Sequence, residues 1–183
     1  MTVEEKLEAV LAPAGIGKYG FLRPAEIPFD PAVRAACEGN TCRGYGATWA
    51  CPPGVGTFAD CRARCLSYER ALVFSVSYPL EDSFDYEAMR AGMLNFKKVC
   101  DRLAEAAGPI VPGFLLLSNE SCFRCRTCTY PEAPCRFPEK LHPSIEGYGI
   151  LVGQLAGLAG IPYGVPGAVT YFGALLFSAQ HIS

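Results

Sequence analysis

The spacing of hydrophobic side chains changes its period several times along this chain. From residue 70 to 78 the large apolar side chains occupy every second position, which predicts a strand. From residue 85 to 107 they recur at steps of three and four, which predicts an amphipathic helix capped by Asp85. Residues 110–117 are almost continuously apolar, which predicts a strand covered on both faces, and residues 168–177 predict a third strand.

Shorter signals predict four more helices. Residues 4–11 have a helical pattern, and a second short helix can begin after Asp30 and Pro31. Thr57 followed by Asp60 forms a capping box, so a helix is expected to begin near Phe58. The remaining segment of residues 12–36 contains many Pro and Gly residues and predicts no regular element.

The fourth of these helices is expected between Ser144, which can cap it, and Gly160, which ends it. One of its faces carries Gly149, Gly153 and Gly157 at intervals of four residues. Glycine lowers helix propensity, so we expect this stripe to allow the helix backbone to approach a sheet, another helix or the cluster closely.

The order strand, helix, strand, cysteine loop, helix, strand predicts an α/β fold. We expect a small, largely parallel sheet with flanking helices and right-handed crossovers, forming one domain over residues 1–183. Residues 37–65 are its first cysteine-rich region, and residues 70–183 are the α/β core. Sites in parallel sheets collect at the carboxyl ends of strands, which is where the cysteine loop of residues 122–135 begins.

Composition limits the compartment and the partners. The start of the chain lacks the basic and apolar regions of a secretory signal, so we expect a cytoplasmic protein with reduced thiols. Sixteen basic and eighteen acidic residues give a formal charge of -2, which offers no electrostatic reason to bind nucleic acid. The expected partners are therefore proteins or small molecules.

The end of the chain carries no formally charged residue after Glu146. Pro162, Gly164, Pro166 and Gly167 divide this region into pieces shorter than the ~20 residues that a membrane-spanning helix needs. We therefore expect no membrane span. The region is expected to be buried in the core or in an interface between subunits of a homo-oligomer.

The densest chemical signal is a run of four cysteines in one loop. Cys122, Cys125 and Cys128 stand at two-residue intervals, and Cys135 follows after six more residues. Such spacing lets three thiolates point into one cavity while the fourth returns from beyond a turn, which is typical of a 4Fe-4S cluster. Zinc and unligated thiols are the alternatives, although structural zinc usually takes its ligands as two separated pairs.

A second group of cysteines precedes it, at irregular spacings. Its members are Cys37, Cys42, Cys51, Cys61 and Cys65. Four of them suffice for a second cluster, and the alternatives are zinc and buried or redox-active thiols. We favour Cys61 over Cys65 as the fourth ligand, because Cys61 stands in the first turn of the predicted helix, where the dipole favours a thiolate. Tyr45 and Trp49 can cover this site or pack beneath its loop. Cys100 lies on the apolar stripe of the long helix and is expected in the core.

Several stretches together resemble a known family. They are Cys-Glu-Gly-Asn-Thr-Cys-Arg-Gly-Tyr-Gly, Trp-Ala-Cys-Pro-Pro-Gly-Val-Gly, Pro-Cys-Arg-Phe-Pro-Glu-Lys and Pro-Ser-Ile-Glu-Gly-Tyr-Gly-Ile. From about Cys37 to Phe177 the chain resembles a domain-of-unknown-function family of predicted metal-binding proteins, common in anaerobic bacteria and archaea. The resemblance implies metal binding by the matching cysteines. These are Cys37, Cys42, Cys51 and Cys61 in the first group, and Cys122, Cys125, Cys128 and Cys135 in the second.

Three classes of function follow from these features. The leading one is an iron–sulfur protein with two 4Fe-4S clusters that acts in electron transfer or as an accessory redox protein, with a redox protein as its partner. The second is an enzyme that uses a cluster with an open iron site, since only His142 and His181 offer acid–base chemistry near neutral pH. The third is a structural zinc-binding interaction module. Arg124, Arg126, Arg136 and Lys140 surround the second loop and can favour a reduced cluster, or can simply form a solvated face.

Overall fold

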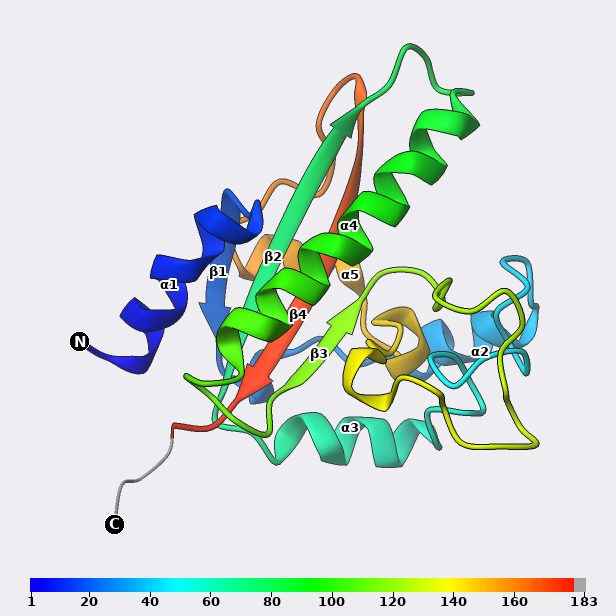
Figure 1. Ribbon diagram of the computed structural model, residues 1–183, viewed down its shortest axis with the longest axis horizontal. Coiled ribbons are helices and arrows are strands. Elements are labelled where there is room, and N and C mark those ends of the chain that lie inside the picture. Colours follow the sequence, from blue (N-terminus) through cyan, green and yellow to red (C-terminus); the bar gives the residue numbers. More distant parts are fainter. Residues whose placement is uncertain (180–183) are drawn as a thin grey trace.

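The computed structural model describes residues 1–179 and contains a four-stranded antiparallel sheet with helices on both faces (Figure 1). The strands lie in the order β1-β2-β4-β3. Their bounds are Lys18–Leu22 for β1, Arg70–Pro79 for β2, Leu115–Ser118 for β3 and Ala168–Phe177 for β4. The helices are α1 (Val3–Ala14), α2 (Pro31–Glu38), α3 (Phe58–Leu66), α4 (Tyr86–Ala107) and α5 (Val152–Leu158), with 3₁₀ turns at Pro24–Glu26, Pro138–Lys140 and Glu146–Tyr148.

The prediction of a largely parallel sheet is wrong. β2 and β3, which α4 connects, run in the same direction, but β4 lies between them and pairs antiparallel with both. Leu175 of β4 is opposite Leu72 on one side and Leu116 on the other. A strand–helix–strand order makes two strands run the same way without making them neighbours, and here the last strand of the chain is inserted between them.

β1 is a strand that the sequence pattern did not reveal. It pairs antiparallel with the outer side of β2, with Tyr19 opposite Phe74 and Phe21 opposite Leu72. The strand is only five residues long and contains Gly20, so its alternation is too short to stand out from the irregular segment around it. It forms because β2 offers a free edge.

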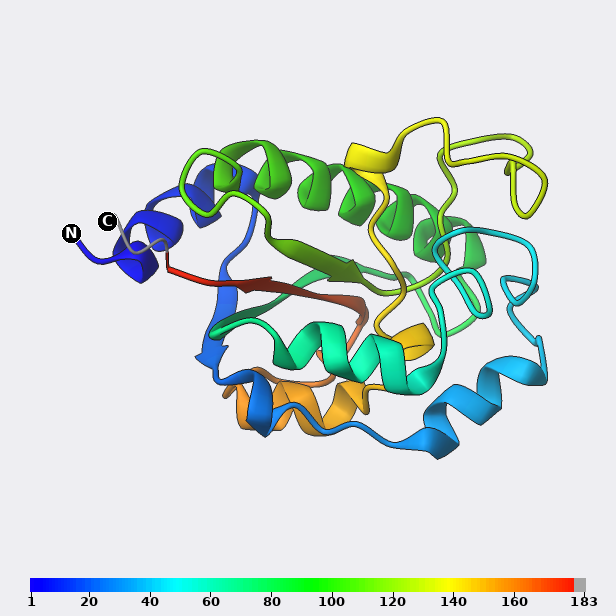
Figure 2. The same cartoon turned by 90° about the horizontal axis from the view of Figure 1, so that it is seen from below.

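The side chains of β2 alternate between two cores, as their period predicts. Leu72 and Phe74 face α1 and α4 on one side of the sheet, whereas Ala71 and Val73 face α3 and α5 on the other. Figure 2 shows this arrangement from below, with α4 on one side of the sheet and α3 and α5 on the opposite side. The apolar stripe predicted between residues 85 and 107 is confirmed, and it packs in the core on the α4 side together with the fully buried Cys100.

Two predicted elements are shorter than expected. The strand of residues 110–117 begins only at Leu115, because a turn with Gly113 at a φ of 78° precedes it. The helix expected after Ser144 is interrupted at Gly149, whose φ is 74°. A 3₁₀ turn therefore precedes that glycine, and α5 begins three residues after it.

The uncharged end of the chain contributes the central strand β4, whose residues from Tyr171 to Phe177 are buried. This confirms burial in the core for that part of the region. Among residues 1–179, no helix combines the length and the hydrophobicity that crossing a bilayer requires.

Candidate metal centre

The two cysteine-rich loops lie side by side at one end of the molecule. Both views place residues 39–57, which join α2 to α3, next to residues 119–143, which follow β3 (Figures 1 and 2). The Trp49 indole of the first loop donates a hydrogen bond to the Ala133 carbonyl of the second at 3.1 Å. Its ring also packs edge-on against Tyr130, with 4.8 Å between the two ring centroids. The Ser144 amide also donates to the Ala50 carbonyl at 2.8 Å. Neither loop is therefore positioned independently of the other.

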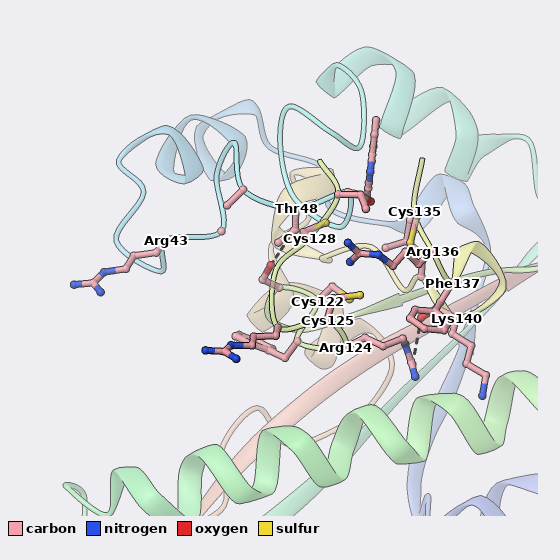
Figure 3. Close-up of a pocket in the computed structure, with 18 of the residues that line it drawn as sticks. Arg43, Thr48, Cys122, Arg124, Cys125, Cys128, Cys135, Arg136, Phe137 and Lys140 are labelled. Atoms are coloured by element: carbon pink, nitrogen blue, oxygen red, sulfur yellow. Dashed lines mark hydrogen bonds between the residues drawn. The ribbon is translucent and has the colours of Figure 1, made fainter. Parts of the chain in front are cut away.

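The four cysteines of the second loop line one cavity of about 840 Å³. They are Cys122, Cys125, Cys128 and Cys135, and each is half-buried. Figure 3 shows these cysteines on loops above α4, which contributes Arg90, Met93 and Leu94 to the cavity. Within residues 1–179, no three His, Cys, Asp or Glu side chains converge closely enough to hold a single metal ion as they stand. The thiols surround a cavity instead of meeting at a point.

Among the described residues that line this cavity, every charged one is a cation. They are Arg43, Arg90, Arg124, Arg126, Arg136 and Lys140. Arg136 is oriented by a 2.8 Å hydrogen bond from its Nη1 to the Thr127 carbonyl, whereas Arg43 points away from the labelled cysteines in Figure 3. Glu120, Glu132 and Glu139 belong to the same stretch of chain but are not among the lining residues. The cavity is therefore suited to a group of negative charge, such as a cluster held by thiolates.

An ion-pair network attaches the second loop to α4. Asp101 on α4 accepts hydrogen bonds from Arg124 at 2.7 and 2.8 Å, and its Oδ1 lies 3.0 Å from His142 Nε2. Burial raises the pKa of Asp101, but hydrogen bonds and positive charge from His142 and Arg124 outweigh it and lower that pKa to about 2. His142 is therefore buried and held by Asp101, whereas His181 lies outside the described residues.

Three of the earlier cysteines line a smaller cavity of about 200 Å³. Cys37 lies in the last turn of α2, Cys42 in the loop after it, and Cys51 is buried near the end of that loop. Burial raises the pKa of Cys37, and the neighbouring Cys51 and Cys42 raise it further. Glu120 and Glu146 line the same cavity. Three thiols and two carboxyl groups are thus gathered around one space.

The backbone near this smaller cavity is held in unusual conformations. Asn40, Arg43 and Glu120, with φ values of 52°, 60° and 65°, are the described non-glycine residues in the left-handed region. All three lie in the two cysteine loops. Such conformations cost free energy, and they occur preferentially where a binding site needs a particular backbone path. Gly44 belongs to the same loop, and a side chain there would lie 2.9 Å from Cys51 Sγ.

Cys61 and Cys65 lie elsewhere. The capping box at the start of α3 is confirmed, since Thr57 Oγ1 accepts from the Asp60 amide at 3.1 Å and the Asp60 carboxylate accepts from the Thr57 amide. However, Cys61 is fully buried and does not line the small cavity. Burial raises its pKa although Arg34 acts against this, and burial raises the pKa of Cys65 to about 12. A ligand role for Cys61 stays a prediction, and the structure does not bring it together with the other three.

The structure adds functional candidates that sequence reasoning missed. Lys97 on α4 is one of them, because its Nζ donates to Ser118 Oγ at 2.7 Å and to the Asn119 carbonyl at 2.5 Å. It thus anchors the segment between β3 and Cys122, and burial lowers its pKa. Its position on the helix carried no signal, since a lysine in an amphipathic pattern is normally solvated.

Ser121 is a second missed residue, and it joins the two cavities. Its hydroxyl accepts from the Cys51 thiol at 3.2 Å and lies 3.0 Å from Thr48 Oγ1, and it lines both cavities together with Cys42. The next residue along the chain is Cys122. The only sequence signal for Ser121 was its position directly before this first cysteine of the second loop. One hydrogen bond and one peptide unit therefore connect the two groups of cysteines.

Comparison with known families gives a match that covers most of the chain. The model of the family described as "Predicted metal-binding protein (DUF2284)" matches residues 20–177, a span that contains both groups of cysteines. No curated protein and no solved structure matches the chain.

Proposed function

The chain belongs to the DUF2284 family of predicted metal-binding proteins, and from that premise we propose that it is an iron–sulfur protein that binds two 4Fe-4S clusters and transfers electrons. The observation that carries the proposal is the 840 Å³ cavity, which the four cysteines of the second loop line together with Cys42 and six cations. The donor set consists of soft thiolates, which suit iron–sulfur clusters, and the cations can compensate their negative charge.

The residues present fit such a group at both cavities. Cys122, Cys125, Cys128 and Cys135 would hold the second cluster, and Cys37, Cys42 and Cys51 would supply three ligands of the first. A bound cluster supplies reversible transfer of one electron at a time. The protein contributes burial, hydrogen bonds to sulfur and nearby charge, which together set the reduction potential.

Trp49 and Lys97 have defined roles in this proposal. Trp49 covers the second site, although it belongs to the first loop, and so limits the access of water. Lys97 places a half-buried positive charge beneath the segment between the two sites, which favours the reduced and more negative state of either cluster. The connection through Ser121 supports electron exchange between the two sites.

The surface around the second site suggests the charge of the redox partner. Arg43, Arg90 and Arg126 line the cavity, and no ion pair within residues 1–179 involves any of the three. Clustered cations accelerate association with a partner of opposite charge, in a manner that salt weakens. The proposed partner is therefore an acidic electron-transfer protein.

Metal analysis tests the proposed function directly. Protein purified without oxygen should contain about eight iron and eight sulfide per chain, and its visible absorption should bleach on reduction. Stoichiometric zinc without sulfide would contradict the proposal and would favour the structural zinc module.

The partner is tested by the salt dependence of electron transfer. Arg43→Glu combined with Arg126→Glu should slow reduction by an acidic donor about tenfold or more at low salt, and the difference should shrink as salt is raised. Lys6→Glu is the matched control, because Lys6 is exposed on α1, at the opposite end of the molecule from the cysteine loops (Figure 1). If Lys6→Glu slowed the reduction as much as the double variant does, the arginines that line the cavity would not form the docking surface.

A further inference from the structure

The smaller cavity provides three thiols, while the sequence predicts a fourth that is not there. We propose that Glu146 is the fourth protein ligand of the first cluster, which is then held by Cys37, Cys42, Cys51 and one carboxylate. This inference rests on the proposed function, because it requires an iron–sulfur cluster at the first site. It assigns the fully buried Cys61 to the core instead.

Cys61 does not line the small cavity, and it contacts groups that stabilise the fold. Its Sγ lies 3.5 Å from the Val55 carbonyl and 3.8 Å from Arg34 Nη1. Arg34 also donates to the carbonyls of Gly147 at 2.8 Å and Gly56 at 2.5 Å, and so ties α2 to both neighbouring segments. A cluster bound by Cys61 would have to displace this guanidinium and break these hydrogen bonds.

Glu146 already has the surroundings of an oriented ligand. One carboxylate oxygen accepts from Asn119 Nδ2, and the other accepts from Ser144 Oγ at 3.0 Å. Asn119 is itself held by β4, since its Oδ1 accepts from the Phe172 amide at 2.5 Å. Ligating carboxylates are typically fixed by hydrogen bonds of this kind, which remove the entropy cost of orienting them. The carboxylate also lines the same cavity as Cys37, Cys42 and Cys51.

Glu120 lines the same cavity but differs in these respects. It is exposed, and within residues 1–179 the hydrogen bond that it accepts, from Lys97 Nζ at 3.4 Å, goes to its backbone carbonyl and not to its carboxylate. It also borders a neighbouring cavity of about 640 Å³, which Glu146 shares. Glu120 therefore provides a matched control with the same functional group at the same cavity.

A carboxylate ligand has consequences that can be measured. Oxygen is a harder donor than sulfur, so it binds iron less tightly and gives the first cluster a spectrum and potential different from those of a cluster with four thiolates. Glu146→Cys would convert a cluster held by three thiolates and one carboxylate into one held by four thiolates, without removing the cluster. This variant keeps the inference testable even where a ligand deletion prevents folding.

The experiment compares four variants purified without oxygen. Glu146→Gln should lose about half of the eight iron, whereas Glu120→Gln and Cys61→Ala should retain the full content. Glu146→Cys should keep about eight iron but change the electron paramagnetic resonance spectrum of the reduced first cluster. Iron, sulfide and these spectra are the readouts, so no activity assay is needed.

The outcomes separate the two levels of the argument. A full iron content in the wild type, with half of it lost in Cys61→Ala and none in Glu146→Gln, would overturn the ligand set and leave the proposed function intact. An unchanged spectrum in Glu146→Cys would also overturn the ligand set. Absence of iron and sulfide from the wild type would overturn the proposed function, and the ligand set with it.

Discussion

Ten cysteines occupy three kinds of environment in the folded chain, and all are free thiols. Seven line the two cavities at one end of the molecule. Cys61 and Cys65 are buried on the α3 side of the sheet, and Cys100 is buried on the α4 side. Burial raises the pKa of Cys100 to about 12, so that thiol stays protonated and behaves as a small apolar side chain. Lining a cavity therefore distinguishes the candidate ligands from the core cysteines.

Cys125→Ser should remove the iron of the second cluster, about half of the total. A hydroxyl is a poor substitute for a thiolate on soft iron, and Cys125 lines the cavity with the other three ligands. Iron and sulfide analysis after anaerobic purification measures the loss. Retention of the full iron content would remove Cys125 from the ligand set.

Cys100→Ala is the matched change in the core. It should leave the iron content unchanged and lower the free energy of unfolding by about 1–2 kcal/mol, the scale of a small core truncation. Chemical denaturation measures the change in stability, and metal analysis checks the iron. Loss of iron here as large as in Cys125→Ser would show that Cys100 affects a cluster.

Among the elements, the segment before α5 depends most on a single glycine. Gly149 has a φ of 74°, and a Cβ there would lie 2.4 Å from the Phe58 ring of α3. The close approach predicted for the glycine stripe therefore occurs at Gly149. Gly157 has open space around it, because it lies on the exposed side of α5.

Gly149→Ala should lower the free energy of unfolding by about 2–4 kcal/mol, since both the backbone conformation and the contact with Phe58 oppose a side chain. Gly157→Ala is the control and should raise stability by up to about 1 kcal/mol, because alanine favours a helix. Denaturant unfolding of both variants measures these values. Equal effects would contradict the roles assigned to the two glycines.

The attachment of the second loop to α4 predicts a pH dependence. The pKa of Asp101 is lowered from 3.8 to about 2 in the folded state, so its ionised form adds stability above about pH 4 that is lost as the pH falls toward 2. Asp101→Asn should cost about 1–2 kcal/mol at pH 7, allowing for partial exposure of the carboxylate. The difference from the wild type should narrow between pH 4 and 2. If the difference in unfolding free energy between the wild type and Asp101→Asn did not change with pH, the ion pairs would not be its source.

At the scale of the whole molecule, the cores and the cysteine loops are separate. The apolar clusters on both faces of the sheet are formed by strands, helices and short turns, and the seven cysteines that line the cavities contribute to neither cluster. Metal binding is therefore expected to order one end of a molecule whose sheet is already stable.

Removal of metal by a chelator should leave the sheet folded and loosen the loops. Amide hydrogen exchange should accelerate about tenfold or more in residues 39–57 and 119–143, whereas β2, β4 and α4 should keep their protection. Circular dichroism should change little. Global unfolding on chelation would show instead that the clusters hold the two cores together.

Features that depend on neighbours along the chain could be read from the residues alone. The alternation in β2, the stripe of α4 and the capping box at Thr57 all involve residues within one or two turns of each other, so period and local hydrogen bonding decide them. The spacing from Cys122 to Cys135 is equally local, and the four thiols do share one cavity.

Features that join distant segments required the folded chain. The insertion of β4 between β2 and β3 makes the sheet antiparallel, and the order of elements along the chain contains no information on which strands become neighbours. Ser121 lies 70 positions after Cys51, and Glu146 is still farther from Cys37, yet each pair meets at the small cavity. The reverse holds for Cys61, which is close to Cys51 in the chain but is buried in the core between α3 and the sheet and does not line the cavity. Spacing along a chain limits how far apart two residues can be, whereas packing decides which of them come together.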